Sequence, residues 1–394
     1  MTDTAAATRL AELVRELRNR EFPWTAATTY LAAASIGPLP ERTRLAIEAF
    51  NAKRTAPHLV PDRDQLAIHA AARAAAAQLL NATPEEIALT PNTSTGLQAA
   101  AGALPLAAGD VVLLSDREFP ANVYPWLAQR RRGVVVERAP VTAAGFPDED
   151  HLVARLADPR VRVLAVSLVQ FSNGYRADLT RLGEACRANG AYLVVDGIQA
   201  LGVVPCDVRA LPVDIVACGG QKWLLGPWGS GFCFVRRELV SQLVPAASGW
   251  LSYRGMDDFG NLLSYDEQLV DDARRFETAS PATQDQLGLT ASIGLLLDLG
   301  VDAIATYLRS LGDPVLEWAA RRGVPVGSPT DPRHRSQIVC VRPPDAREAN
   351  RRLRQAGIVV SLREGAIRIA PHCYNTIEEM EKVVEVLDEV VREG

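Results

Sequence analysis

Two apolar runs, each closed by a polar residue, decide the expected fold: AYLVVDGIQ at residues 191–199 and VDIVACGGQKWLLG at residues 213–226. Asp196 ends the first run, and Lys222 follows the second among glycines. Unbroken apolar runs of this length are typical of strands that are covered on both faces of a sheet. Because the runs lie about one strand–helix–strand unit apart, we expect neighbouring strands whose polar residues meet at the ligand-binding edge of an open α/β sheet.

Further short apolar runs alternate with helical patterns between residues 86 and 235. The seven predicted strands are Ile87–Leu89, Val111–Leu114, Gly133–Glu137, Val161–Ser167, Tyr192–Val195, Asp214–Ala217 and Gly231–Val235. The predicted helices between them include 122–131, 148–157 and 179–189. This alternation predicts an α/β fold with a mostly parallel seven-stranded sheet and helices on both faces.

The C-terminal part has a different pattern and predicts a second, smaller lobe. Its expected elements are two long helices at 286–299 and 303–321, short strands near 336–341, 358–361 and 366–369, and a last helix over 376–392. We therefore predict an N-terminal segment, residues 1–44, that associates with the small domain. Residues 45–284 are predicted to form a large cofactor-binding domain, and residues 285–394 a small α+β domain.

Composition excludes several classes of protein. With 394 residues, 48% hydrophobic residues, 23% charged residues and a net charge of −5, the chain fits neither a disordered protein nor a general nucleic-acid-binding surface. The six cysteines show neither CxxC spacing nor the spacing of a disulfide framework, so we expect no disulfide framework. The five histidines do not have the spacing of metal ligands, so we expect no metal site. Without a signal-peptide core or an apolar window of spanning length, the expected location is cytoplasmic and no membrane partner is expected.

Lys222 and Asp196 together predict pyridoxal phosphate (PLP) chemistry. Burying the charged ammonium group of a lysine in an apolar, glycine-lined loop is costly. Desolvation there lowers the pKa of the lysine, and the neutral amine that results can react. A lysine that forms an imine and an acid that keeps a pyridine nitrogen protonated are the protein groups that PLP needs most. Taken singly, Asp196 could be a helix N-cap and Lys222 a surface lysine; their pairing favours the cofactor.

Three further segments supply candidate binding groups. Thr93, Ser94 and Thr95 open a helix after a strand, where free amides and hydroxyls suit a phosphate, although an ordinary N-cap has the same pattern. Phe119 follows a strand at the same edge, where its ring either stacks on a planar cofactor or belongs to the core. Arg368 alternates with apolar neighbours on a short strand and either grips a substrate carboxylate or forms a structural ion pair; Arg363 is a weaker candidate.

These segments, in this order from Tyr30 to Thr376, resemble the class V aminotransferase family of PLP enzymes, which includes cysteine desulfurases, isopenicillin N epimerase-like proteins and kynureninases. The resemblance implies an aspartate-aminotransferase-like fold, PLP as cofactor, and a homodimer with active sites at the subunit interface. It implies that Lys222 carries the cofactor as an aldimine, with Asp196 at the pyridine nitrogen. The predicted cofactor-binding residues are Thr93, Ser94, Thr95, Phe119, Gln170, Asp196, Gln199, Gln221, Lys222, Ser280 and Thr283, and the predicted substrate-binding residues are Arg368 and Trp250.

The resemblance also assigns finer roles. Gln199 corresponds to the contact with the phenolic oxygen of the cofactor, and Gln170 to a contact with the ring face. Ser280 or Thr283 would reach the phosphate bound by the partner subunit. Gly219 stands where a phosphate-binding serine is common, so this contact is missing or supplied by Gln221.

Departures from the family pattern bear on the reaction. Desulfurases stack a histidine where this chain has Phe119, and they carry a nucleophilic cysteine shortly before the carboxylate-binding arginine, whereas residues 360–367 contain none and Cys373 comes after Arg368. We therefore expect an enzyme that acts on an α-amino acid through a carbanion, as an aminotransferase or epimerase, with the freed Lys222 as general base. The alternatives are a C–S or C–Se lyase without the usual cysteine and, more remotely, a non-catalytic binding protein on the same fold.

Overall fold

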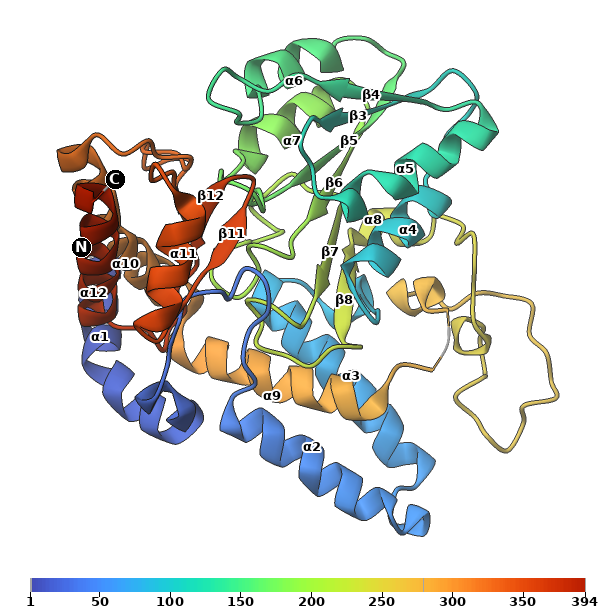
Figure 1. Ribbon diagram of the computed structural model, residues 1–394. Helices are drawn as coiled ribbons and strands as arrows, with labels where there is room; N and C mark the ends of the chain where they lie inside the picture. Colours follow the sequence, from blue (N-terminus) through green and yellow to red (C-terminus); the bar gives the residue numbers. More distant parts are fainter. Residues whose placement is uncertain (1, 279, 394) are drawn as a thin grey trace.

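A seven-stranded sheet forms the centre of the computed structural model, which describes residues 2–278 and 280–393 (Figure 1). The strand order is β2-β8-β7-β6-β5-β3-β4. The strands are β2 (Ile87–Leu89), β3 (Val111–Ser115), β4 (Val135–Ala139), β5 (Val161–Ser167), β6 (Tyr192–Asp196), β7 (Ile215–Gly219) and β8 (Gly231–Val235). β8 runs antiparallel to β2 and β7, and the other neighbours are parallel, so the predicted sheet is confirmed.

Alternating burial on the strands explains why the sheet is covered on both faces. On β5, Leu164 and Val166 belong to one hydrophobic cluster. Val163 and Ala165, which point the other way, belong to a second cluster. Helices α6 (Glu149–Leu156) and α7 (Leu179–Ala188) cover the first face, and α4 (Thr93–Ala103) and α5 (Tyr124–Ala128) the second (Figure 1). Each fully buried aliphatic side chain contributes about 1.5–3 kcal/mol of transfer free energy.

The smaller lobe contains a three-stranded antiparallel sheet in the order β11-β12-β9. Its elements are β9 (Val339–Val341), β11 (Ser361–Arg363), β12 (Ala366–Ile369), α10 (Val301–Arg322), α11 (Ala346–Gln355) and α12 (Ile377–Glu393). Helix α1 (Thr2–Glu21) packs beside α10, and β1 (Thr29–Tyr30) pairs with β10 (Ile358–Val359) (Figure 1). The N-terminal segment therefore packs against the small lobe. Helix α9 (Thr283–Leu299), which the predicted boundary assigns to the small domain, packs along α2 (Glu41–Arg54) and α3 (Asp62–Leu80).

One predicted helix is broken in the structure. The stretch 122–131 contains only the short α5, flanked by 3₁₀ turns at Pro120–Asn122 and Gln129–Arg132. Pro120 and Pro125 explain the break, because proline removes a backbone donor and is accommodated in a first helical turn but not in a helix interior.

Two negative findings concern the described residues. No group of three or more histidine, cysteine or acidic side chains among them could hold a metal ion. No single helix in the described chain combines the length and apolarity needed to cross a membrane; α9 and α10 meet the criterion only as a pair bent by 78°.

Candidate active site

Asp196 and Lys222 meet at one edge of the large sheet. Asp196 is the last residue of β6 and pairs with Ala217 of β7, and Lys222 follows shortly after β7 ends. The Asp196 side chain is 1% exposed; its Oδ1 accepts a hydrogen bond from the Ile198 amide at 2.9 Å, but its Oδ2 has no partner among the described residues. A buried carboxylate oxygen without a donor is costly, so the position suits an incoming N–H group.

The environment disfavours charge on both groups. Burial raises the pKa of Asp196 to about 7, and the negative charge of Glu118 adds to the shift, whereas the Ile198 amide and Lys222 oppose it. Burial lowers the pKa of Lys222 to about 8; the charges of Arg368 and Arg363 act in the same direction, and Asp196 opposes them. A lysine whose pKa lies near 8 provides a substantial fraction of neutral amine, the nucleophilic form, under mildly alkaline conditions.

The backbone around Lys222 is fixed by the N-terminal segment. The Gly37 amide donates to the Gln221 carbonyl at 2.9 Å. A Cβ atom at Gly37 would lie 2.0 Å from the Lys222 carbonyl oxygen, so only glycine permits this approach. The segment before α2 therefore helps to hold the lysine in place.

The start of α4 lies beside the end of β7. The Thr93 hydroxyl accepts from the Gly219 amide at 2.8 Å, and Asn92 Oδ1 accepts from the Thr95 amide and hydroxyl. The amides of Thr93 and Ser94 are the first two of the helix and have no intrahelical acceptor. The structure thus offers two free amides at a positive helix end, whereas the Thr95 hydroxyl is used in the cap.

Gln221 lies at the same helix start. A Cβ atom at Gly219 would be 2.5 Å from Gln221 Oε1 and 3.3 Å from the Thr93 amide nitrogen. The missing side chain at Gly219 therefore leaves room for the Gln221 amide next to the predicted phosphate position.

Phe119 lies next to the lysine. The Lys222 Nζ atom is 5.4 Å from the Phe119 ring centroid, and the Phe119 ring meets Phe171 edge-to-face at 5.2 Å. Phe119 is 39% exposed, so the reading as a core phenylalanine does not hold. A half-exposed ring beside the lysine suits stacking on a planar cofactor.

The two predicted glutamines are buried and bonded to protein groups. Gln199 donates to the Ala34 carbonyl at 3.0 Å and accepts from Trp223 Nε1 at 2.7 Å. Gln170 donates to Glu118 at 2.6 Å. Both lie in the site region, and their direct contacts with a cofactor remain predictions.

Glu118 was not predicted from the sequence. Its buried carboxylate accepts hydrogen bonds from the Ser167 amide (2.9 Å) and hydroxyl, from Gln170 and from Asn122 (3.2 Å). Ser167 pairs with Asp196 across β5 and β6, so Glu118 sits next to the predicted pyridine partner. Burial raises the pKa of Glu118, and its four hydrogen bonds oppose this shift. The available signal was an acidic residue directly before Phe119, three residues after the buried strand β3 ends.

Arg368 enters the site from β12. Its guanidinium donates from Nη1 to the Phe171 carbonyl at 2.7 Å and from Nη2 to Ser35 Oγ at 2.8 Å, and its buried Nε has no partner in the described chain. No acidic side chain among the described residues forms an ion pair with Arg368, which is 2% exposed. Burial lowers the pKa of Arg368 to about 10, and the charge of Arg363 adds to this effect. The absence of a structural ion pair favours an anion-binding role.

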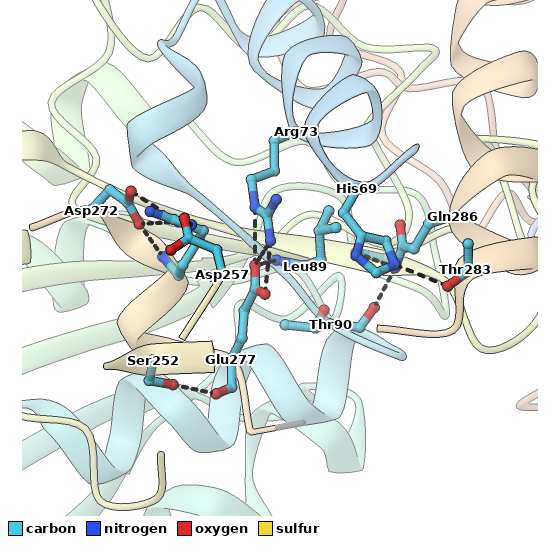
Figure 2. Close-up of polar contacts among 12 residues, drawn as sticks. His69, Arg73, Leu89, Thr90, Ser252, Asp257, Asp272, Glu277, Thr283 and Gln286 are labelled. Carbon is cyan, nitrogen blue, oxygen red and sulfur yellow. Dashed lines mark hydrogen bonds and ion pairs between the residues drawn. The ribbon is translucent and has the colours of Figure 1, made fainter. Parts of the chain in front are cut away.

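The segment that carries Ser280 is anchored at the end of β2 by Glu277. Glu277 accepts from Arg73 Nη2 at 2.7 Å and from the Leu89 amide at 2.9 Å (Figure 2). Thr283 Oγ1 lies 3.1 Å from His69 Nε2 of the same chain (Figure 2). The exposed Ser280 lines a cavity of about 260 Å³ together with Thr95 and Gln286. Contacts of Ser280 and Thr283 with a partner subunit remain predictions.

Trp250 lies on the long segment that follows α8 (Arg237–Val240). Its ring meets Phe259 edge-to-face at 5.9 Å and lines an apolar hollow of about 470 Å³ with Tyr253, Met256, Leu262 and Tyr265. The contacts found for Trp250 in the described chain do not include Arg368, and the substrate-binding role of Trp250 remains a prediction.

The fold and the lysine–aspartate edge of the sheet define a PLP-type α/β enzyme, and comparisons with known proteins identify the class. The chain belongs to the aminotransferase class-V family, whose sequence profile matches residues 30–383. Members of this family are PLP-dependent enzymes, so the predicted family is confirmed.

Relatives in this family have different names and reactions. Isopenicillin N epimerase from Amycolatopsis lactamdurans is 32% identical and aligns over 92% of this chain and 95% of its own length. The uncharacterized aminotransferase YcbU from Bacillus subtilis is 31% identical over 78% of this chain and 80% of its own. A probable cysteine desulfurase from Methanothermobacter thermautotrophicus is 28% identical and aligns over 95% of this chain and 98% of its own length.

Solved structures support the fold class. The cysteine desulfurase CsdA from Escherichia coli aligns with a TM-score of 0.83 at 24% identity, over 96% of this chain and 98% of that one. A C-DES variant with glycine covalently linked to its PLP cofactor aligns with a TM-score of 0.84 at 23% identity, over 94% and 98%. At this identity the likeness concerns the fold alone, and it confirms the predicted fold class.

Proposed function

We propose that this chain binds PLP at Lys222 and acts on an α-amino acid, as an aminotransferase or an epimerase. The observation that carries the proposal is the pairing of a desolvated lysine amine with a buried aspartate oxygen that lacks a donor. The unpartnered Oδ2 of Asp196 fits a protonated ring nitrogen, because that group supplies the N–H that the carboxylate lacks.

The cofactor would be held by groups already in place. The free amides of Thr93 and Ser94, with Gln221 beside them, would bind the phosphate at the start of α4. Phe119 would stack on the ring, and Asp196 would hold a proton at the ring nitrogen. When bound, PLP supplies an electron-withdrawing ring that stabilises negative charge at the α-carbon of the substrate.

The chain's own residues would then bind the substrate and remove its α-proton. Arg368 binds the α-carboxylate through a guanidinium that has no acidic partner in the described chain. Lys222 in its neutral form takes the α-proton as general base, and the lowered pKa makes that form accessible. Protonation of the α-carbon on the opposite face, by solvent or a second acid, would give epimerisation. Amino-group transfer would instead need a 2-oxo acid that receives the amino group.

Sulfur transfer through a protein thiol is disfavoured. All six cysteines are buried. Burial raises the pKa of Cys373 to about 12, and its side chain is fully enclosed next to His372. A thiol must be accessible and readily ionised to act as a nucleophile, and these cysteines are neither. A β-eliminating lyase that uses no thiol remains the second candidate, and a non-catalytic binding protein is the remote one.

We further propose a cytoplasmic homodimer, in which Ser280 or Thr283 reaches the cofactor of the neighbouring subunit. The family resemblance supports this assembly. Sedimentation of the purified protein at two concentrations tests the dimer.

The test of function is a panel of L- and D-amino acids with the PLP-loaded protein, in the presence and absence of 2-oxo acids and in deuterated water. We expect deuterium incorporation at the α-carbon, together with either inversion or formation of a new amino acid. Release of sulfide or pyruvate from cysteine-type substrates would instead establish the lyase. The protein with Lys222 replaced by alanine is the control, and a wild-type protein that leaves every amino acid unchanged would refute the proposal.

A further inference from the structure

A second guanidinium, that of Arg363, lies beside Arg368 at the entrance of the site. The hairpin β11–β12 pairs Ser361 with Arg368 and Arg363 with Ala366. Because side chains alternate along a strand, Ser361, Arg363 and Arg368 share one face of this hairpin. Ser35 Oγ accepts from Arg368 Nη2 at 2.8 Å and from Arg363 Nη2 at 3.5 Å, so one hydroxyl is within reach of both guanidinium groups.

Arg363 has no acidic partner among the described residues. Its hydrogen bonds are to the Leu362 carbonyl at 2.9 Å and to Ser35, although Glu364 follows it directly in the sequence. Some other exposed arginines do have acidic partners: Arg333 pairs with Asp331, and Arg351 with Glu348. An exposed arginine left unpaired beside a buried unpaired arginine is an arrangement that attracts anions.

The charges around the entrance are unbalanced. Lys222, Arg368 and Arg363 lie close enough to repel one another, and both arginines disfavour the charged form of the lysine. The carboxylates that face this group, Asp196 and Glu118, are buried below it at the end of the large sheet. One α-carboxylate can neutralise one guanidinium only, which leaves a second cation uncompensated.

We infer that the substrate carries a second carboxylate on its side chain and that Arg363 is the residue that selects it. The inference rests on the proposed function. Arg368 is buried, so it binds the α-carboxylate that all amino acids share. Arg363 is exposed at the outer position and meets the part of the substrate that differs between amino acids. The expected substrate class is therefore the acidic amino acids or larger amino acids that end in a carboxylate.

The experiment compares L-glutamate with L-glutamine and L-aspartate with L-asparagine on the PLP-loaded wild type and on R363Q and R363K. Binding is read from the change in the visible spectrum of the cofactor, and turnover from product mass. We expect the wild type to prefer the acids by at least about tenfold in kcat/KM, as one charge-assisted hydrogen bond allows. R363Q should lose this preference through weaker binding of the acids only, and R363K should retain part of it.

Arg342→Gln is the matched control. Arg342 is exposed and donates to the Glu364 carbonyl at 2.8 Å, so its replacement removes a cation at the turn of the same hairpin without touching the shared serine. R342Q should leave the preference unchanged. A wild type that prefers the amides, or an R363Q variant that weakens acids and amides equally, would overturn the inference. If no amino acid changes the cofactor spectrum, the proposed function itself fails, and the two failures are thus distinguishable.

Discussion

The floor and the entrance of the site are built in opposite ways. The floor is formed by the buried Glu118 and Asp196 and by the half-buried Lys222 at the end of the large sheet, and it contains both carboxylates. The entrance, formed by Arg363 and Arg368 of the small lobe with Ser35 of the N-terminal segment, contains only cations. Under the proposed function, the large lobe would hold the cofactor, and the cations of the small lobe would be neutralised by the substrate.

Replacing Lys222 with alanine tests the floor with the largest expected effect. We expect no detectable turnover, because no other described amine lies at the sheet edge to take its place. The measurement is product formation from the best substrate of the panel. K222R is the companion variant, since it keeps a cation but not the nucleophile; full activity in either variant would contradict the mechanism.

Replacing Asp196 with asparagine removes the ring-nitrogen partner while keeping the shape of the floor. We expect kcat to fall about a hundredfold to a thousandfold, as for other oriented electrostatic groups in active sites. Asp214→Asn is the control, because Asp214 is a half-buried carboxylate beside the opposite end of β7 and its replacement should leave kcat nearly unchanged. Equal losses in both variants would mean that Asp196 serves stability alone.

Replacing Arg368 with glutamine tests the entrance. Loss of charge-assisted hydrogen bonds to the α-carboxylate should raise KM by about tenfold to a hundredfold, with a smaller effect on kcat. Initial-rate kinetics measure both constants. A change confined to kcat would mean that Arg368 acts in the chemical step. This would contradict its assignment to substrate binding at the entrance.

Replacing Glu118 with glutamine tests whether the floor contributes more than the entrance to the free energy of unfolding. The carboxylate accepts four hydrogen bonds in a buried position, so E118Q should lower the free energy of unfolding by about 1–3 kcal/mol. R363Q, an exposed change, should alter it by less than about 0.5 kcal/mol. Urea unfolding of the two apoproteins measures both changes in the free energy of unfolding. Similar changes would mean that the floor and the entrance do not differ in their contribution to stability.

The smallest expected effect concerns the titration of Lys222. Because its pKa is lowered to about 8, its reaction with an amine reagent should rise through a midpoint near pH 8 in the apoprotein. Asp196 favours the charged lysine, so D196N should move the midpoint down; Arg363 disfavours it, so R363Q should move the midpoint up. Labelling is followed by mass spectrometry of the peptide that contains Lys222, and shifts in the reverse directions would contradict the assignment of charges.

The sequence predicted the floor better than the entrance, for physical reasons. All seven strands of the large sheet were predicted because their apolar runs are local, and the Asp196–Lys222 pairing followed from two neighbouring strands. Glu118 and Ser35 were missed because their roles depend on contacts with Ser167 and Arg368, which lie far away in the sequence. The break in the stretch 122–131 was predictable from Pro125, which a helix accommodates only in its first turn.

The most direct test of the central claim is borohydride reduction of the protein after incubation with PLP, followed by peptide mapping. The chain contains three lysines, Lys53, Lys222 and Lys382, so the other two serve as internal controls. We expect a yellow protein and a stoichiometric mass tag on the peptide that contains Lys222. A colourless protein, or a tag spread over Lys53 and Lys382 without Lys222, would contradict it.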